Sequence, residues 1–331
     1  MSVREELTAI LGKARGFWEA RILMTAAELD VFSLLNDAPK TAQRVCEELS
    51  SDRRGTEALL NALVALGLLV KKDGAFRTRP GFERALSRST PETVLPMLRH
   101  MAQLWTRWGE LTEIVLRGKE ARSSEALERD LEGVRSFIGA MHAIGREMAE
   151  GVVSKLDLSE RENMIDVGGG SGVYTIAALS AAPRMRATLF DSPLVTEIAR
   201  EKLADAGLLD RVTLASGDFE SDALPGGHDL ALLSAIIHQN DRRQNVALYR
   251  KVWRALVPGG EVVIRDHVMS DDHTEPVSGA LFAINMLVNT AGGGTYSFDE
   301  IGADLEAAGF VDPKLLHRDE MDSLVTARRP V

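Results

Sequence analysis

The chain has 331 residues, of which 45% are hydrophobic and 27% are charged, and its formal net charge is −10. This length predicts two domains, and the composition is that of an ordinary globular protein. The acidic balance disfavours nucleic acid and anionic membranes as partners, because both carry negative charge.

The single cysteine, Cys46, excludes an internal disulfide and a cysteine-based metal site. The first residues, MSVREELTAILGK, contain acids and no apolar run, so we expect no secretory signal. The longest apolar stretch, residues 62–70, is far shorter than the ~20 residues that span a membrane. We therefore expect a cytoplasmic protein with no membrane segment.

The first hundred residues are predicted to be mainly helical. Apolar residues recur at helical spacing over residues 17–35 and again over 56–70. The following KKDGAFRTR predicts a short hairpin that turns at Asp73 and Gly74. Two helices followed by a basic hairpin are the pattern of a winged helix.

Two functions are open for this winged-helix-like region. Residues 40–90 carry ten Lys/Arg against six Asp/Glu, which indicates DNA binding. The acidic charge of the whole chain and the catalytic pattern of the second half favour a packing and dimerisation module instead. Residues 92–160 are predicted to form further helices that lead into the second domain. We expect a dimerisation domain over 1–100, a helical segment that contributes to the active site over 101–160, and a catalytic domain over 161–331.

From residue 163 the pattern changes to short apolar runs separated by helical stretches. The runs NMIDV, RATLFD, RVTLAS, DLALLSA and EVVIRD predict strands, and PKLLHR and SLVTARR predict two more. Such alternation predicts an α/β fold with a mainly parallel sheet and helices on both faces. Ser192-Pro193 predicts a helix start, and Ser297 with Glu300 predicts a capping box.

A glycine loop follows the first of these strands. In MIDVGGGSG the strand ends near Asp166, and Gly168, Gly170 and Gly172 then turn the backbone into a helix. A dinucleotide fingerprint starting at Gly168 requires a glycine at position 173, where Val173 stands. The spacing instead favours a ligand without a pyrophosphate, bound beyond the carboxyl ends of the strands.

Acidic residues close the next two strands as well. Asp191, followed by Ser192, ends the second strand, where a carboxylate is able to accept hydrogen bonds from both hydroxyls of a ribose. After the third strand, Asp218 is placed to accept from an adenine amine, and Phe219 to pack on the base. Three acids at successive strand ends, Asp166 included, suit a cationic ligand. A helix cap at Asp191 and a turn residue at Asp218 are the structural alternatives.

At this point the chain resembles the class I, S-adenosylmethionine-dependent O-methyltransferases, which include plant caffeate-type and hydroxyindole enzymes and bacterial tailoring enzymes. DVGGGSG, FDSPLV and SGDFE resemble the family's DVGGGTG, FDLPHV and GDFF. LLSAIIHQND resembles LKWVLHDWDD, and LVPGGEVVIRD resembles LPPGGKVVIVE. The resemblance covers nearly the whole chain. It implies a Rossmann-like, seven-stranded catalytic domain that binds S-adenosylmethionine, preceded by a winged-helix-like domain that forms a homodimer.

The resemblance also implies a catalytic pair. His238 follows the fourth strand at the position of the family's general base, and Asp266 ends the fifth strand at the position of the acid that holds this base. A histidine titrates near neutral pH and is able to take a phenol proton. A carboxylate beside it fixes the tautomer and stabilises the imidazolium. A purely structural histidine is the alternative at position 238.

The chain departs from the family pattern at three places. His238-Gln239-Asn240 replaces the usual HDW, so an aromatic residue is missing. Ser234 stands where a lysine is frequent, and we expect it beside the cofactor. A threonine, Thr295, stands where the family has a second acid. Two alternatives follow for the chain: a reaction that needs less help from a base, as with an acidic phenol or a carbon nucleophile, or loss of the reaction.

The acceptor pocket is predicted to be shaped by helical residues. These are Met141 and His142, together with Asn285 and Asn289, which are four residues apart and share one helical face. No metal site is expected, because His267 and His273 lack a compact ligand spacing with Asp266.

These observations predict methyl transfer from S-adenosylmethionine to a hydroxyl of a small aromatic or polyketide-like acceptor. C- or N-methylation with the same cofactor is the alternative among enzymes. A non-catalytic ligand-binding or DNA-binding regulator that kept the fold is the alternative of another class.

Overall fold

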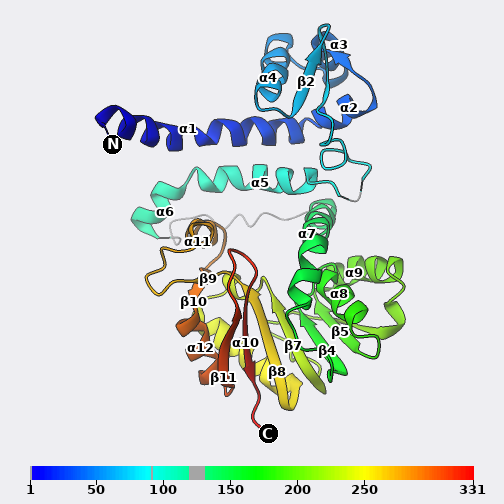
Figure 1. Cartoon of the computed structure of the whole chain (residues 1–331), viewed down its shortest axis with the longest axis vertical. Coiled ribbons are helices and arrows are strands. Elements are labelled where there is room, and N and C mark those ends of the chain that lie inside the picture. The colour runs from blue at the N-terminus through cyan, green and yellow to red at the C-terminus, as the bar shows by residue number, and fades with distance from the viewer. Residues whose placement is uncertain (1, 91, 119–130) are drawn as a thin grey trace. The chain divides into compact units, whose positions relative to one another are not determined.

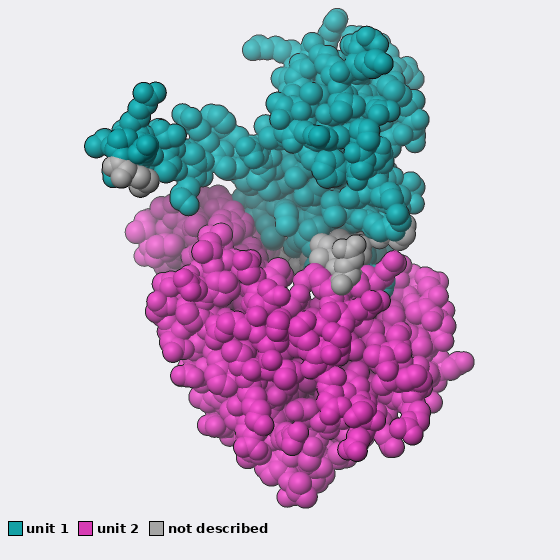
Figure 2. Space-filling view, in the orientation of Figure 1, with its two compact units in different colours: residues 1–105, 132–143 teal, residues 106–131, 144–331 magenta. Residues whose placement is uncertain are grey.

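The computed structural model describes residues 2–90, 92–118 and 131–331. The chain divides into two compact units (Figure 2). Residues 1–105 and 132–143 form the first unit, and residues 106–131 and 144–331 form the second.

The first unit is mainly helical, with a small three-stranded antiparallel sheet of order β1-β3-β2. Its hairpin turns at Asp73 and Gly74, whose φ angles are 49° and 79°, so the predicted hairpin is confirmed. Thr41 and Asp52 cap the two helices that precede this hairpin. The elements in chain order are α1 (Val3–Glu28), α2 (Val31–Asp37), β1 (Lys40–Thr41), α3 (Ala42–Leu49), α4 (Arg53–Ala65), β2 (Leu69–Lys72), β3 (Ala75–Thr78) and α5 (Leu95–Trp108), which continues into the second unit.

Helix α1 is unusual within this unit because most of it is exposed. Only Ala26 and Ala27 of its 26 residues are buried. Large apolar side chains such as Leu7, Phe17 and Trp18 remain more than half exposed. By contrast, the end of α1 packs with α2, α4 and the hairpin around a core that includes Phe32, Leu35, Leu60, Leu63 and Phe76.

The second unit contains a seven-stranded sheet of order β11-β12-β8-β7-β4-β5-β6 (Figure 1). The five strands from β8 to β6 run parallel, and β12 and β11 are antiparallel additions at one side. The predicted mainly parallel sheet is thus confirmed. Its strands are β4 (Asn163–Val167), β5 (Arg186–Asp191), β6 (Val212–Ser216), β7 (His228–Ser234), β8 (Leu256–Asp266), β11 (Val311–His317) and β12 (Ser323–Arg328).

Helices cover both faces of this sheet (Figure 1). Helices α10 and α12 pack on one face, and α8, α9 and the end of α7 pack on the other. A separate two-stranded pairing joins β9 to β10. The remaining elements are α6 (Leu111–Arg117), α7 (Leu131–Val153), α8 (Val173–Ala181), α9 (Pro193–Asp205), η2 (Leu209–Arg211), η3 (Ile237–Gln239), α10 (Arg242–Ala255), β9 (Val268–Met269), α11 (Val277–Asn289), β10 (Tyr296–Ser297) and α12 (Phe298–Ala307).

The helix signals read from the sequence agree with these bounds. Pro193 is the first residue of α9, and Ser192 occupies the cap position without a side-chain cap bond. At α12 the Ser297 hydroxyl accepts from the N–H of Glu300, and the Glu300 carboxylate accepts from the N–H of Ser297. The predicted capping box is confirmed.

No helix among the described residues combines the length and the apolar character that crossing a membrane requires.

Candidate active site

The glycine loop between β4 and α8 is closed on one side and open on the other. Gly168, Gly170 and Gly172 have φ angles of 69°, 57° and 78°, where side chains cause strain. A Cβ on Gly168 would collide with Ile236, whereas a Cβ on Gly170 would meet nothing within 4 Å. The loop therefore packs on the protein through Gly168 and leaves its backbone approachable at Gly170.

Asp166 lies beneath this loop at the end of β4. Its carboxylate is 1% exposed and accepts a hydrogen bond of 2.7 Å from the Thr175 hydroxyl in α8. Burial raises the pKa of Asp166 to about 6. The acid thus joins the strand to the first turn of the helix.

Asp191, at the end of β5, faces the glycine loop from the neighbouring strand. Its carboxylate accepts from the N–H of Gly170 at 2.9 Å and from the N–H of Ser192 at 2.7 Å. Burial raises the pKa of Asp191 above its ordinary value, and the two N–H groups oppose that rise. Asp191 therefore links the open part of the loop to the start of α9.

The other residues expected at the cofactor lie at the same edge of the sheet. Asp218 is exposed after β6 and accepts from the N–H of Glu220 at 2.8 Å. Phe219 packs against the core, 3.7 Å from the position of a Cβ on Gly168. Ser234 is half-buried at the end of β7.

This half of the site suits an adenosyl ligand with a cationic sulfur. Gly170 gives a ligand room to approach the main chain, and the acids Asp166, Asp191 and Asp218 make the edge electronegative. The Asp191 oxygens lie where hydroxyl groups of a ligand near Gly170 have hydrogen-bond acceptors.

His238 and the buried Asp266 form a hydrogen-bonded pair at the same edge. Nδ1 of His238 lies 2.9 Å from both carboxylate oxygens of Asp266. The side chain of Asp266 is 2% exposed, and that of His238 is 12% exposed. Burial opposes ionisation of Asp266, but the attraction and hydrogen bond of His238 outweigh it, so the pKa of Asp266 falls below its ordinary value. The N–H of His267 also donates to Asp266, at 2.8 Å.

The segment that carries Thr295 contacts His238 through its backbone. The N–H of Gly294 donates to the carbonyl oxygen of His238 at 3.0 Å. Thr295 is buried, and its hydroxyl donates to the carbonyl oxygen of Gly279 at 3.3 Å. Within the described ranges, Asp266 is the acid that is hydrogen-bonded to His238.

One face of α11 lies against His238. The ring of Phe282 meets the His238 ring edge to face, with centroids 4.8 Å apart. Asn285 and Asn289 lie one and two turns further on, and Nδ2 of Asn289 donates to Oδ1 of Asn285 at 2.9 Å, which confirms that they share a face. Oδ1 of Asn285 also accepts from the indole N–H of Trp108 at 3.1 Å. Met141 and His142 are half-buried on α7, in the part of this helix that belongs to the first unit.

Three residues near the site were not predicted from the sequence. Thr175 binds Asp166, Phe282 contacts His238, and His267 packs on Phe282 with ring centroids 4.7 Å apart. Phe282 stands three residues before Asn285 on the same helical stripe, so the spacing that selected the two asparagines also indicates Phe282.

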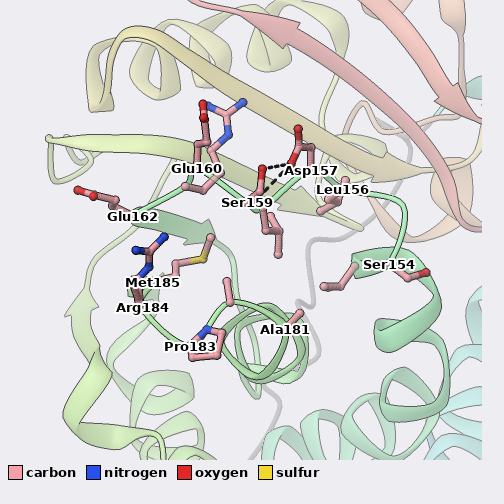
Figure 3. A pocket seen from close by; sticks show the side chains of 14 residues that line it. Ser154, Leu156, Asp157, Ser159, Glu160, Glu162, Ala181, Pro183, Arg184 and Met185 are labelled. Atoms are coloured by element: carbon pink, nitrogen blue, oxygen red, sulfur yellow. Dashed lines mark hydrogen bonds between the residues drawn. The ribbon is translucent and has the colours of Figure 1, made fainter.

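A hollow of about 610 Å³ lies elsewhere on the second unit (Figure 3). It is lined by residues 153–154 and 156–162, before β4, and by residues 181–185, before β5. It therefore lies at the amino ends of the strands, opposite the glycine loop. No group of three or more His, Cys, Asp or Glu side chains within residues 2–90, 92–118 and 131–331 is arranged to hold a metal ion.

The strand order, the glycine loop and the acids around it define a class I methyltransferase. Comparison with protein-family models identifies an O-methyltransferase domain over residues 108–311 and an O-methyltransferase dimerisation domain over residues 12–85. The chain belongs to the S-adenosylmethionine-dependent O-methyltransferases, and it is an enzyme of this family. Its cofactor is S-adenosylmethionine.

Similar proteins span almost the whole chain. The tetracenomycin polyketide synthesis 8-O-methyl transferase TcmO of Streptomyces glaucescens is 32% identical over 97% of this chain and 96% of its own. The 3-hydroxy-5-methyl-1-naphthoate 3-O-methyltransferase of Streptomyces sahachiroi is 35% identical over 86% and 84%. Among solved structures, PigF with SAH matches with a TM-score of 0.89 and 25% identity, over 99% of this chain and 100% of that one. Human N-acetylserotonin methyltransferase in complex with SAM matches with a TM-score of 0.85 and 25% identity, over 100% and 99%.

Proposed function

We propose that this enzyme methylates a hydroxyl of an aromatic or polyketide-like small molecule, with His238 as the general base. The observation that carries the proposal is the hydrogen bond from Nδ1 of His238 to the buried carboxylate of Asp266. This bond fixes the proton on Nδ1, so Nε2 keeps a lone pair that is able to accept a proton.

His238 and Asp266 then act together. Nε2 of His238 takes the proton of the acceptor hydroxyl, and the deprotonated oxygen becomes the nucleophile. Asp266 holds Nδ1–H throughout and stabilises the imidazolium that forms. When bound, S-adenosylmethionine supplies an electrophilic methyl group on a cationic sulfur.

For the cofactor we propose the residues of the glycine loop and of the strand ends beside it. Gly168, Gly170 and Gly172 shape the loop, with Asp166 beneath it, and Asp191 with Ser192 accepts from the ribose hydroxyls. Asp218 and Phe219 hold the adenine, and Ser234 lies beside them. Their shared edge, and the open space at Gly170, support this assignment.

For the acceptor we propose a phenol of moderate acidity. A single acid, Asp266, supports His238 among the described residues, because Thr295 instead donates to a backbone carbonyl. A base with one acidic partner suits a hydroxyl that loses its proton readily. We further propose that Asn285 and Asn289, on the face of α11 that meets His238, line the acceptor site.

The base is tested with His238→Ala. We expect kcat to fall by roughly 100-fold or more, the range for loss of a general base, with little change in affinity for S-adenosylhomocysteine. His273→Ala is the matched control, because His273 lies on an exposed turn. Full turnover of the His238 variant would show that another group takes the proton. Mass spectrometry and NMR of the product separate O-methylation from C- or N-methylation.

We propose that residues 1–100 form the homodimer interface, that residues 101–160 contribute to the active site, and that residues 161–331 carry catalysis. The match to a dimerisation domain and the exposed apolar side chains of α1 support the first of these assignments. Replacing Phe17 and Trp18 by serine should shift the mass measured by light scattering from dimer to monomer. A wild-type monomer at micromolar concentration would refute the assignment.

A further inference from the structure

The imidazole of His238 packs against an aromatic ring in addition to its hydrogen bond with an acid. The rings of His238 and Phe282 meet edge to face, with centroids 4.8 Å apart and planes at 88° to each other. This is a preferred geometry for two aromatic rings, and it stabilises them beyond the apolar area that they bury. Phe282 therefore contacts the proposed base in a defined orientation.

A second ring supports Phe282 from another element. His267 packs on Phe282 with ring centroids 4.7 Å apart and planes inclined by 35°. His267 is 4% exposed, and its Nδ1 lies 2.8 Å from the carbonyl oxygen of Glu320, which fixes the ring. The backbone N–H of His267 also donates to Asp266, the acid that binds His238. The three rings and the acid thus form one connected cluster.

The start of the helix that carries Phe282 is held from two sides. Gly279, one turn before Phe282 on α11, is buried, and a Cβ there would collide with the sulfur of Met269 on β9. The carbonyl oxygen of Gly279 also accepts from the Thr295 hydroxyl at 3.3 Å. Residues three apart lie on one face of a helix, so these contacts also hold Phe282 in place.

A hydrogen bond at Nδ1 does not by itself hold the plane of the His238 ring. It fixes one atom, and the ring is still able to tilt about the contact between Nδ1 and Asp266. A base must keep Nε2 within hydrogen-bond reach of the acceptor hydroxyl, and a misplacement of about 1 Å costs ~100-fold in rate. Among the residues that the structure describes, Asp266 is the acid bonded to His238, so another contact has to restrict this tilt.

We propose that Phe282 is a positioning residue, whose ring holds the imidazole plane of His238 so that Nδ1–H stays on Asp266 and Nε2 faces the acceptor hydroxyl. This proposal rests on the proposed function, in which His238 is the base. It assigns Phe282 to proton removal and not to capture of the acceptor. Loss of the ring should therefore affect acceptors that must lose a proton and spare acceptors that are already ionised.

The first measurement is nitrogen NMR of the histidine side chains, in the protein loaded with S-adenosylhomocysteine at about pH 8, where an unperturbed histidine is neutral. The spectrum reports which ring nitrogen carries the proton, and His238→Ala identifies the signals of His238. In the wild type we expect the proton on Nδ1. Phe282→Leu should give a mixture of both tautomers, whereas Phe282→Tyr, which keeps the ring, should retain the Nδ1–H form.

The second measurement is methyl transfer to naphthol, which is neutral at this pH, and to nitrophenol, which is ionised. Phe282→Leu should lower kcat for naphthol roughly tenfold or more, a part of what a general base contributes, and should leave KM for naphthol and kcat for nitrophenol unchanged. Phe282→Tyr should restore kcat for naphthol. Phe298→Leu is the matched control and should behave as the wild type, because Phe298 is also half-buried but packs on the core of the second unit.

Thermal unfolding and affinity for S-adenosylhomocysteine verify that each variant is folded. Phe282→Met, which removes the ring but fills much of its volume, repeats both measurements if the leucine variant unfolds.

An unchanged tautomer of His238 in the folded leucine or methionine variant would overturn the proposal. Equal losses with naphthol and nitrophenol, or an equal loss in Phe298→Leu, would also overturn it. The tautomer decides the matter even when neither phenol is methylated. Failure of the proposed function is a separate result, because it appears as full turnover in His238→Ala, whereas the tautomer of His238 is measured without any acceptor.

Discussion

Replacing Asp266 by asparagine changes one oxygen of a buried acid into an amide nitrogen. Two N–H groups point at this acid, Nδ1–H of His238 and the backbone N–H of His267. A carboxylate satisfies both, whereas an amide has one accepting and one donating end. Because the backbone N–H of His267 donates to Oδ1, the amide oxygen takes that position, and the amide nitrogen takes the Oδ2 position, which also lies 2.9 Å from Nδ1 of His238.

The tautomer of His238 decides how large the effect is. An amide N–H facing Nδ1 forces the proton of His238 onto Nε2, the atom that must accept from the substrate. General-base catalysis contributes about 10²- to 10⁴-fold, so we expect kcat to fall within this range. This corresponds to about 3–5 kcal/mol of transition-state stabilisation.

The assay is single-turnover methyl transfer from labelled S-adenosylmethionine, with affinity for S-adenosylhomocysteine measured in parallel. With an acceptor that is already ionised at the assay pH, such as a nitrophenol, the loss in Asp266→Asn should shrink toward that of the control. Asp304→Asn is the matched control, because Asp304 is also a buried, paired acid but bonds to Arg242 on α10. Full activity of the Asp266 variant, or an equal loss with ionised and neutral acceptors, would refute the reasoning.

Three further predictions concern the glycine loop and the acids at the strand ends beside it. Asp191→Ala should weaken S-adenosylmethionine binding about tenfold or more, because a carboxylate acceptor is lost, and unchanged affinity in calorimetry would contradict this. Gly168→Ala should lower the free energy of unfolding by about 2–4 kcal/mol, because position 168 has a positive φ and a Cβ there collides with Ile236. The control is Gly151→Ala, whose Cβ would meet nothing within 4 Å, and it should not lower the free energy of unfolding. Denaturant titration measures both variants. Asp166→Asn should gain stability relative to the wild type as the pH rises from 4 to 7. The folded-state pKa of Asp166 is raised from 3.8 to about 6, so ionisation costs the folded wild type stability increasingly between pH 4 and pH 6, up to about 3 kcal/mol above pH 6. A pH-independent difference between the two proteins would contradict this.

Much of the fold is predictable from the sequence because the signals are local. Alternating apolar runs predict the strands of the parallel sheet, and Asp73-Gly74 predicts a turn whose dihedral angles the structure confirms. The Ser297–Glu300 capping box is confirmed for the same reason. These features depend on backbone preferences and hydrogen bonds that reach only a few residues along the chain.

The candidate site is only partly predictable in this way. Spacing places Asn285 and Asn289 on one face of a helix, and the structure confirms this. The resemblance to a known family pairs His238 with Asp266, and these two residues, 28 positions apart, are hydrogen-bonded in the structure. Spacing does not show that Thr295 donates to the carbonyl of Gly279, because that contact joins two segments that meet only in the folded protein.

The sequence by itself thus determined the class of the fold, the glycine loop and the chemistry available at the strand ends. Only the tertiary structure decided which side chains surround the proposed base, since His267 binds Glu320 from 53 residues away and packs on Phe282 from another element. Which rings meet around one imidazole depends on every neighbour that folding brings to it, and these neighbours are not encoded in the spacing of any one segment.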